Sequence, residues 1–147
     1  MIRLALPSDT APVQAIAAEA YAPYTPLIGR PAAPAVADYG ARIAAGQTHV
    51  YEVDGQIAGY IVAFALDGAW ELDAVGVDPA YQGQGIGGAL IAHCEAAALA
   101  QGYRAVTLYT NVMMSANLTL YPALGYISTG RRIVDGYDRV YFRKDLL

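Results

Sequence analysis

The sequence predicts a mixed α/β (α+β) fold built on a mostly antiparallel sheet, and three observations support this prediction. Short β-branched runs alternate with helical segments along the chain. Asp54 and Gly55 separate two alternating apolar runs, as in a two-residue hairpin turn. A strand over residues 70–77 leads through a short loop into a glycine-rich turn and an apolar helix. We therefore expect one domain over residues 1–147, with about seven strands and about four helices.

Strands are predicted where β-branched and aromatic residues cluster, and helices where apolar residues recur at helical spacing. Four prolines interrupt residues 21–35, which indicates an ordered surface loop. The expected elements are, in order, strand 2–6, helix 10–21, loop 21–35, helix 35–45, strands 48–53, 56–66 and 70–77, helix 85–101, strand 104–110, helix 115–124, and strands 126–134 and 137–144.

Composition and charge exclude several classes of protein. The chain has 147 residues, of which 56% are hydrophobic, so it is long and apolar enough to bury a core. A net charge of −4 and the lack of any basic run argue against a nucleic-acid partner. Cys94 is the only cysteine, which excludes a disulfide framework and a cysteine-based zinc site, and we expect no metal. With no signal-like or membrane-length apolar run, we expect a cytoplasmic protein without a membrane partner.

The glycines before helix 85–101 indicate a phosphate-binding turn. Glycine lets the backbone approach a ligand closely, and free amides at a helix start attract anions. No lysine follows these glycines, which excludes a P-loop. Gly83, Gly85 and Gly88 match the spacing of a dinucleotide-binding fingerprint, but the next strand ends in Thr110 and Asn111 without the required acid. A nicotinamide-dependent enzyme is therefore the third alternative.

A different pattern, Gln/Arg-x-x-Gly-x-Gly/Ala, is satisfied by Gln82, Gly85 and Gly87. It resembles the acyl-CoA pyrophosphate loop of the GCN5-related N-acetyltransferases, the GNAT superfamily. A second resemblance to that family is Asn117, followed four residues later by Tyr121 and then by Leu-Gly-Tyr. The expected order of strands and helices also resembles the GNAT fold over nearly the whole chain.

The resemblance implies that acetyl-CoA is the co-substrate. Its pantetheine arm would lie where strands 70–77 and 104–110 splay apart, and Gly76 either forms the bulge known there or packs under a large neighbour. Neutral glutamines stand where many relatives have cations, and Arg104, Arg131 and Arg132 are the candidates for the 3′-phosphate. The implied contacts come from Val75, Val77 (whose N–H would meet the acetyl carbonyl), Gln82, Gly83, Gln84, Gly85, Ile86, Gly87, Gly88 and Asn117.

Two side chains are candidates for the chemistry. A primary ammonium with a pKa of about 10 must lose a proton before it can attack. Glu71 stands at the strand position where many GNAT enzymes carry a glutamate base, and strand alternation places Glu71 and Asp73 on the same face as Val75 and Val77. By resemblance, the Tyr121 hydroxyl protonates the leaving sulfur. Solvated strand carboxylates and a buried structural tyrosine are the alternatives.

The sequence therefore predicts an N-acetyltransferase that moves an acetyl group from acetyl-CoA to a primary amine by direct attack in a ternary complex. The acceptor is a small-molecule amine or a peptide amine, and loop 21–35 and Tyr137 are candidates for its pocket. Homodimers are common in the family, so a homodimer is a further expectation. The alternative is a CoA-binding sensor or regulatory module that kept the glycine loop and lost turnover.

Overall fold

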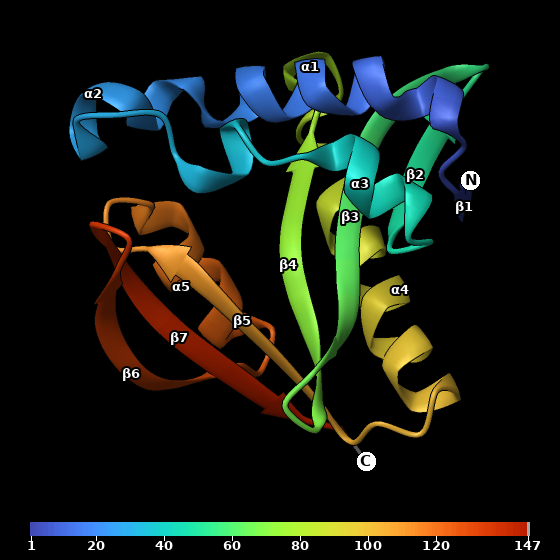
Figure 1. Ribbon diagram of the computed structural model, residues 1–147. Coiled ribbons are helices and arrows are strands. Elements are labelled where there is room, and N and C mark those ends of the chain that lie inside the picture. The colour runs from blue at the N-terminus through green and yellow to red at the C-terminus, as the bar shows by residue number, and fades with distance from the viewer. Residues whose placement is uncertain (147) are drawn as a thin grey trace.

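The computed structural model describes residues 1–146, and Leu147, the last residue of the expected domain, lies outside them. Seven strands form one sheet in the order β1-β2-β3-β4-β5-β7-β6 (Figure 1). Every neighbouring pair is antiparallel except β4 and β5, which confirms a mixed, mostly antiparallel sheet. The strands are β1 (Ile2–Leu4), β2 (Thr48–Val53), β3 (Gln56–Leu66), β4 (Ala69–Val77), β5 (Ala105–Asn111), β6 (Ile127–Val134) and β7 (Tyr137–Asp145).

Helices cover both faces of this sheet (Figure 1). One core cluster lies between the sheet and α1 and α3, and it includes Val13, Tyr39 and Tyr60. A second cluster, which includes Leu90 and Phe142, lies under α4 and α5. No helix within residues 1–146 is long and apolar enough to cross a membrane. The helices are α1 (Thr10–Tyr21), the single turn α2 (Thr25–Ile28), α3 (Tyr39–Ala44), α4 (Ile86–Ala100) and α5 (Ser115–Ala123).

Most expected elements are confirmed, and two segments differ. Helix α3 begins at Tyr39 rather than at residue 35, because the Asp38 side chain caps it by accepting from the Ala41 N–H at 3.0 Å. The predicted irregular loop 21–35 contains α2 and the 3₁₀ turns Ala22–Tyr24 and Ala33–Ala35. A proline lies in the first positions of each of these turns, where it lacks no helical hydrogen bond.

The sheet opens between β4 and β5, as the resemblance implied (Figure 1). The two strands pair only over a short register in which Trp70 faces Val106 and Leu72 faces Leu108. Beyond Leu72 the strands diverge, because β4 changes direction at a bulge. Val62 on β3 pairs with Ala74, but the next residue pairs with Leu72, so Asp73 is the extra residue. A bulge bends its strand and increases its twist, which separates β4 from β5.

The bulge therefore lies at Asp73 and not at Gly76. Gly76 pairs with Tyr60 on β3, and a Cβ at position 76 would lie 2.6 Å from the Tyr60 ring. The glycine is required by close packing under a large neighbour, which was the other interpretation of Gly76.

The same bulge makes one sequence prediction wrong. Leu72, Val75 and Val77 pack in the core cluster beneath α4, although simple alternation would place Leu72 opposite the two valines. Because the extra residue shifts the alternation, the side chains of Glu71 and Asp73 do not share a face with Val75 and Val77. The two carboxylates point instead to the opposite side of the sheet, into the opening beside β5.

Candidate active site

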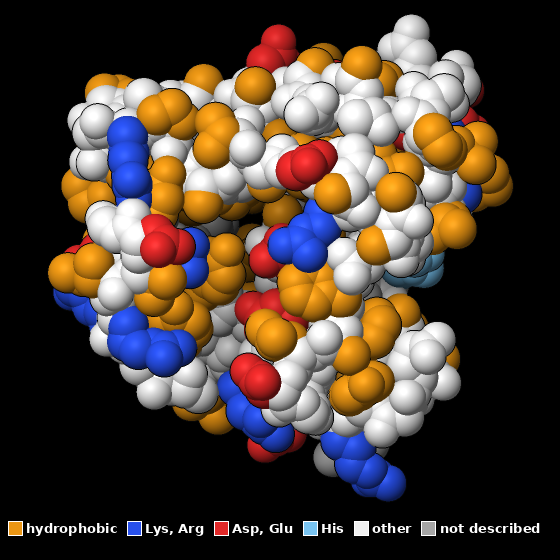
Figure 2. All heavy atoms as spheres, viewed as in Figure 1, with side chains coloured by type: hydrophobic (Ala, Val, Ile, Leu, Met, Phe, Trp, Pro, Cys, Tyr) orange, Lys and Arg blue, Asp and Glu red, His pale blue; other side chains and the backbone are white. Residues whose placement is uncertain are grey.

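Three connected hollows occupy the gap between β4 and β5. The glycine-loop groove, of about 330 Å³, runs along β4 between α4 and α5, and the front cleft, of about 360 Å³, lies between β4 and strands β5 and β7. A central chamber of about 40 Å³ shares Val75 and Tyr121 with the groove and Asp73 and Arg139 with the cleft. Figure 2 shows the molecule hollowed at this place, with acidic and basic side chains around the opening.

The glycine loop leaves its backbone accessible to a ligand. Gly83 and Gly85 have φ angles of 80° and 78°, a left-handed conformation that strains any residue with a Cβ. Gly85 precedes the first residue of α4, and within residues 1–146 no side chain caps this helix start. A Cβ placed on Gly83, Gly85 or Gly88 would meet no atom within 4 Å. The open space and the uncapped amides fit a pyrophosphate held by the backbone.

The other predicted loop residues are placed in two ways. Gln82, Gly87 and Gly88 line the glycine-loop groove directly. Ile86 buries its side chain in the core, with 4% of its surface exposed, so only its backbone can contact a ligand. Gln84 is exposed beside the positive-φ glycines and does not line the groove.

The edge of β4 directs backbone groups into the gap. In an antiparallel ladder, residues alternate between hydrogen-bonding to the partner strand and pointing away from it. The Asp78 N–H donates to the Ala58 carbonyl on β3 at 2.8 Å, so Val77 and Val75 direct their N–H and C=O groups away from β3. The Val75 carbonyl accepts from the Tyr21 hydroxyl at 2.6 Å. The Val77 N–H therefore has the orientation that the predicted contact with a thioester oxygen requires.

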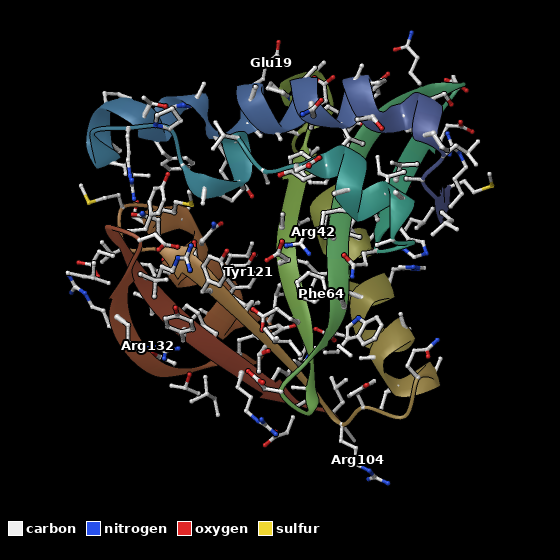
Figure 3. All side chains as sticks on the ribbon, viewed as in Figure 1. Glu19, Arg42, Phe64, Arg104, Tyr121 and Arg132 are labelled. Carbon is white, nitrogen blue, oxygen red and sulfur yellow. The ribbon has the colours of Figure 1, made fainter. Side chains whose placement is uncertain are left out.

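Helix α5 places Tyr121 at the junction of groove and chamber, and Figure 3 shows it beside the opening. Its ring is 4% exposed and packs on Tyr126 and Phe142 at centroid distances of 5.7 and 5.9 Å. Burial raises the pKa of Tyr121 to about 12, so the hydroxyl keeps its proton at neutral pH. Pro122 lies inside α5, which ends at Ala123, and Gly125 follows the C-cap with a φ of 96°.

Asn117 lies one helical turn before Tyr121 and lines the same two hollows. Its Nδ2 donates to the Thr110 hydroxyl on β5 at 3.1 Å, which fixes the direction of the amide. Among residues 1–146 the side-chain oxygen of Asn117 accepts no hydrogen bond, so it can bind a ligand in the groove.

The two carboxylates on β4 lie in different surroundings. Glu71 is 8% exposed and accepts a hydrogen bond from the Thr107 hydroxyl at 2.5 Å. Burial raises the pKa of Glu71, the Thr107 hydrogen bond opposes this by stabilising the charged form, and the nearby Asp73 carboxylate adds to the increase. Burial also raises the pKa of Asp73, while Arg42, at 3.7 Å, and Arg139 hold it down in part. Only Asp73 of the two also lines the central chamber.

Arg139 and Tyr109 are lining residues that the sequence does not predict. Arg139 on β7 stacks over the Tyr109 ring on β5, with the guanidinium carbon 4.0 Å from the ring centroid. Both side chains line the chamber and the front cleft. Their proximity depends on β7 lying beside β5, a pairing that skips β6 and that no local pattern indicates.

The three arginines considered for the 3′-phosphate do not lie at the glycine loop. Arg132 lines the front cleft, and Arg131 pairs with Asp138 at 2.7 Å. Arg104 follows the other end of α4, where Figure 3 shows it pointing outward. The structure therefore gives the 3′-phosphate none of these cations.

Comparisons with known proteins identify the family. The sequence profile of the Acetyltransferase (GNAT) family matches residues 13–126, and the chain belongs to this family. A search of curated proteins by sequence found no match.

Solved structures of several acetyltransferases share the fold. Ard1 from Thermoplasma volcanium is 20% identical with a TM-score of 0.79, and the match covers 100% of this chain and 97% of that one. PaiA N-acetyltransferase from Thermoplasma acidophilum, solved with coenzyme A, is 18% identical with a TM-score of 0.80, covering 99% and 98%. A ribosomal-protein alanine N-acetyltransferase from Escherichia coli is 21% identical with a TM-score of 0.77, covering 99% and 93%. At these identities the likeness establishes the fold alone.

Proposed function

We propose that this protein transfers an acetyl group from acetyl-CoA to a primary amine by direct attack in a ternary complex. One observation carries the proposal: two open grooves of different chemistry meet at a chamber lined by residues from both. The glycine-loop groove suits the phosphates and pantetheine arm of acetyl-CoA. The front cleft brings the amine to the same chamber from the other side. Holding both reactants in line lowers the entropic cost of their reaction.

Three groups of this chain would serve the reaction. Glu71 accepts the proton of the attacking amine, directly or through one water, and its raised pKa makes it a stronger base than an ordinary carboxylate. The Val77 N–H donates to the thioester oxygen as negative charge develops there. The amine nitrogen bonds to the acetyl carbon, the carbon–sulfur bond breaks with its electron pair on sulfur, and the Tyr121 hydroxyl donates to that sulfur.

The Tyr121 hydroxyl acts on the sulfur as a hydrogen-bond donor. A tyrosine with a pKa of about 12 gives up its proton less readily than an ordinary thiol, whose pKa is about 8.5. The hydroxyl is therefore better suited to hydrogen-bond the departing thiolate than to protonate it completely. The proton taken from the amine can neutralise the sulfur later, when the product leaves.

We also propose the setting in which this enzyme acts. It needs no metal, because the barrier is lowered by a carboxylate base and hydrogen-bond donors. We propose a cytoplasmic enzyme, and the net charge of −4 supports an acceptor that is a small-molecule or peptide amine rather than nucleic acid. A homodimer is part of the same proposal, which sedimentation of the purified protein would test.

A thermal-shift titration with acetyl-CoA, CoA and NAD tests the proposal first. A ligand that binds only the folded state raises the midpoint of unfolding by mass action. We expect a saturable rise with acetyl-CoA and CoA and none with NAD, followed by thiol release when amines are added. Binding without turnover on any amine would instead support a CoA-binding sensor. No response to either CoA compound at millimolar concentration would contradict both functions.

A further inference from the structure

The front cleft carries charges of both signs close together. Glu71 and Asp73 line it from β4, and Arg132 and Arg139 line it from β6 and β7. Figure 3 shows Arg132 on the β6 side of the opening, across from Arg42, which lies over β3 and β4. A cleft for a simple cationic amine needs only the carboxylates. The arginines therefore require an explanation of their own.

Arg139 has no carboxylate partner among residues 1–146, unlike several other arginines of the protein. Arg42 pairs with Asp73, and Arg143 pairs with Asp145. The Arg139 guanidinium is instead held by aromatic faces, 4.0 Å from the Tyr109 centroid and 5.9 Å from that of Tyr137. Stacking fixes the plane of the guanidinium while leaving its N–H donors in the plane unused. A guanidinium whose coplanar N–H groups are unpaired can bind a carboxylate with two parallel hydrogen bonds.

We infer that the acceptor is a free amino acid, whose ammonium group binds beside Asp73 and whose carboxylate binds Arg139. The inference rests on the proposed acetyl transfer and names its substrate class. Asp73 and Arg139 both line the central chamber, and the Arg139 charge lowers the pKa of the Asp73 carboxyl. The two opposite charges thus lie close enough to contact one small zwitterion. A polyamine would place a second ammonium near Arg139, where like charges repel.

The roof of the chamber supports a small acceptor. The Tyr137 hydroxyl donates to the Pro31 carbonyl at 2.7 Å, which ties the β6–β7 turn to the segment between α2 and α3. Arg30 stacks on the Tyr137 ring at 3.6 Å and donates to the Asp135 carbonyl. These contacts close the hollow on that side, and the chamber that remains has about 40 Å³. A compact amino-acid head group suits this space better than a folded protein surface.

Matched pairs of acceptors test this inference. Each amino acid is assayed beside its decarboxylated amine, for example histidine with histamine, tyrosine with tyramine and lysine with cadaverine. We expect the wild type to favour at least one amino acid over its amine by about 10-fold or more in kcat/KM, because hydrogen bonds to charged groups are stronger than those between neutral groups. Arg139→Gln should remove this preference by lowering kcat/KM for the amino acid only. Arg139→Glu should reverse it in favour of the amine.

Arg104→Gln is the matched control, because it removes one exposed positive charge outside the three hollows. It should keep the wild-type preference. Stabilisation by acetyl-CoA is measured for every variant, so that a folding defect is separated from a change in specificity. An equal preference for both members of every pair, or a preference that survives Arg139→Glu, overturns the inference. Acetyl-CoA binding without acetylation of any amino acid also overturns it, whereas the loss of acetyl-CoA binding by the wild type contradicts the proposed function itself.

Discussion

The two sides of the opening in the sheet are built from different parts of the chain. On the glycine-loop side, the groups proposed to hold the phosphates and the thioester oxygen belong to the backbone: the positive-φ turns at Gly83 and Gly85, the start of α4, and the Val77 N–H. The front cleft presents side chains, including the Glu71 carboxylate and the Arg139 guanidinium. Backbone recognition tolerates many sequences, whereas side-chain recognition changes with one substitution. Under the proposed function, substitutions in the front cleft would therefore change the acceptor while the acyl donor stays the same.

Replacement of Glu71 by Gln is expected to lower the rate most, because it removes the proposed base from the front cleft. General-base catalysis contributes about 10²–10⁴-fold, so kcat should fall by roughly this factor while the KM for acetyl-CoA stays constant. The measurement is steady-state kinetics over a pH series. Since the carboxylate must be deprotonated to act, the wild-type rate should rise as pH passes the raised pKa of Glu71, and the variant should lack this rise. A variant with the wild-type pH profile would remove Glu71 from the mechanism.

Thr107→Val sharpens this test without deleting the base. The Thr107 hydroxyl donates to Glu71 and so lowers its pKa. Without this donor the pKa of Glu71 should rise further, and the acidic limb of the rate profile should move to higher pH. A merely structural role for Thr107 would lower the rate at all pH values without moving the limb.

Replacement of Gly85 by Val tests the proposed recognition of phosphate by the backbone of the glycine loop. The substitution forces a β-branched residue to a φ of 78° and fills the open space before α4. The loss of one or two charge-assisted hydrogen bonds to phosphate should raise the KM for acetyl-CoA on the order of 100-fold. Gly55→Val is the matched control, because Gly55 has a φ of 80° in the β2–β3 turn and also faces open space. The control should lose comparable stability while keeping the wild-type KM.

The same contrast explains what the sequence could predict. The hairpin at Asp54 and Gly55 and the strands beside it follow from local turn chemistry, and both residues adopt positive φ as that turn requires. The glycine loop was equally recognisable, because a phosphate-binding turn needs its residues close together in sequence. The front cleft depends on contacts between distant segments. Arg139 meets Tyr109 only because β7 pairs with β5, so neither residue carried a signal of its own.

The bulge at Asp73 shows a second reason why the site could not be predicted fully from the sequence. Strand alternation assumes an uninterrupted pairing, and one extra residue shifts the face of every side chain that follows. The sequence offers Gly76 as a more obvious site for a bulge, but Gly76 is needed there for packing against Tyr60. The position of the bulge depends on how β3 pairs with β4, and that register is a property of the folded sheet.

Tyr121→Phe tests the residue at the junction of the glycine-loop groove and the chamber, and it should lower kcat less than Glu71→Gln does. The ring would keep its packing on Tyr126 and Phe142, so stability and acetyl-CoA binding should change little. A hydrogen bond to a developing thiolate contributes about 1.5–3 kcal/mol, which predicts a fall in kcat of about 10- to 100-fold.

The acyl donor distinguishes this role of Tyr121 from a structural one. A thiolate whose parent thiol has a lower pKa is more stable and needs less stabilisation by the hydroxyl. The ratio of the wild-type rate to the Tyr121→Phe rate should therefore be smaller with such a thioester. Single-turnover kinetics with acetyl-CoA and an activated aryl thioester would measure this directly. An equal ratio of wild-type to variant rate for both donors would show that the hydroxyl does not act on the sulfur. The Val77 N–H on β4 would then be the only proposed donor to the reacting thioester.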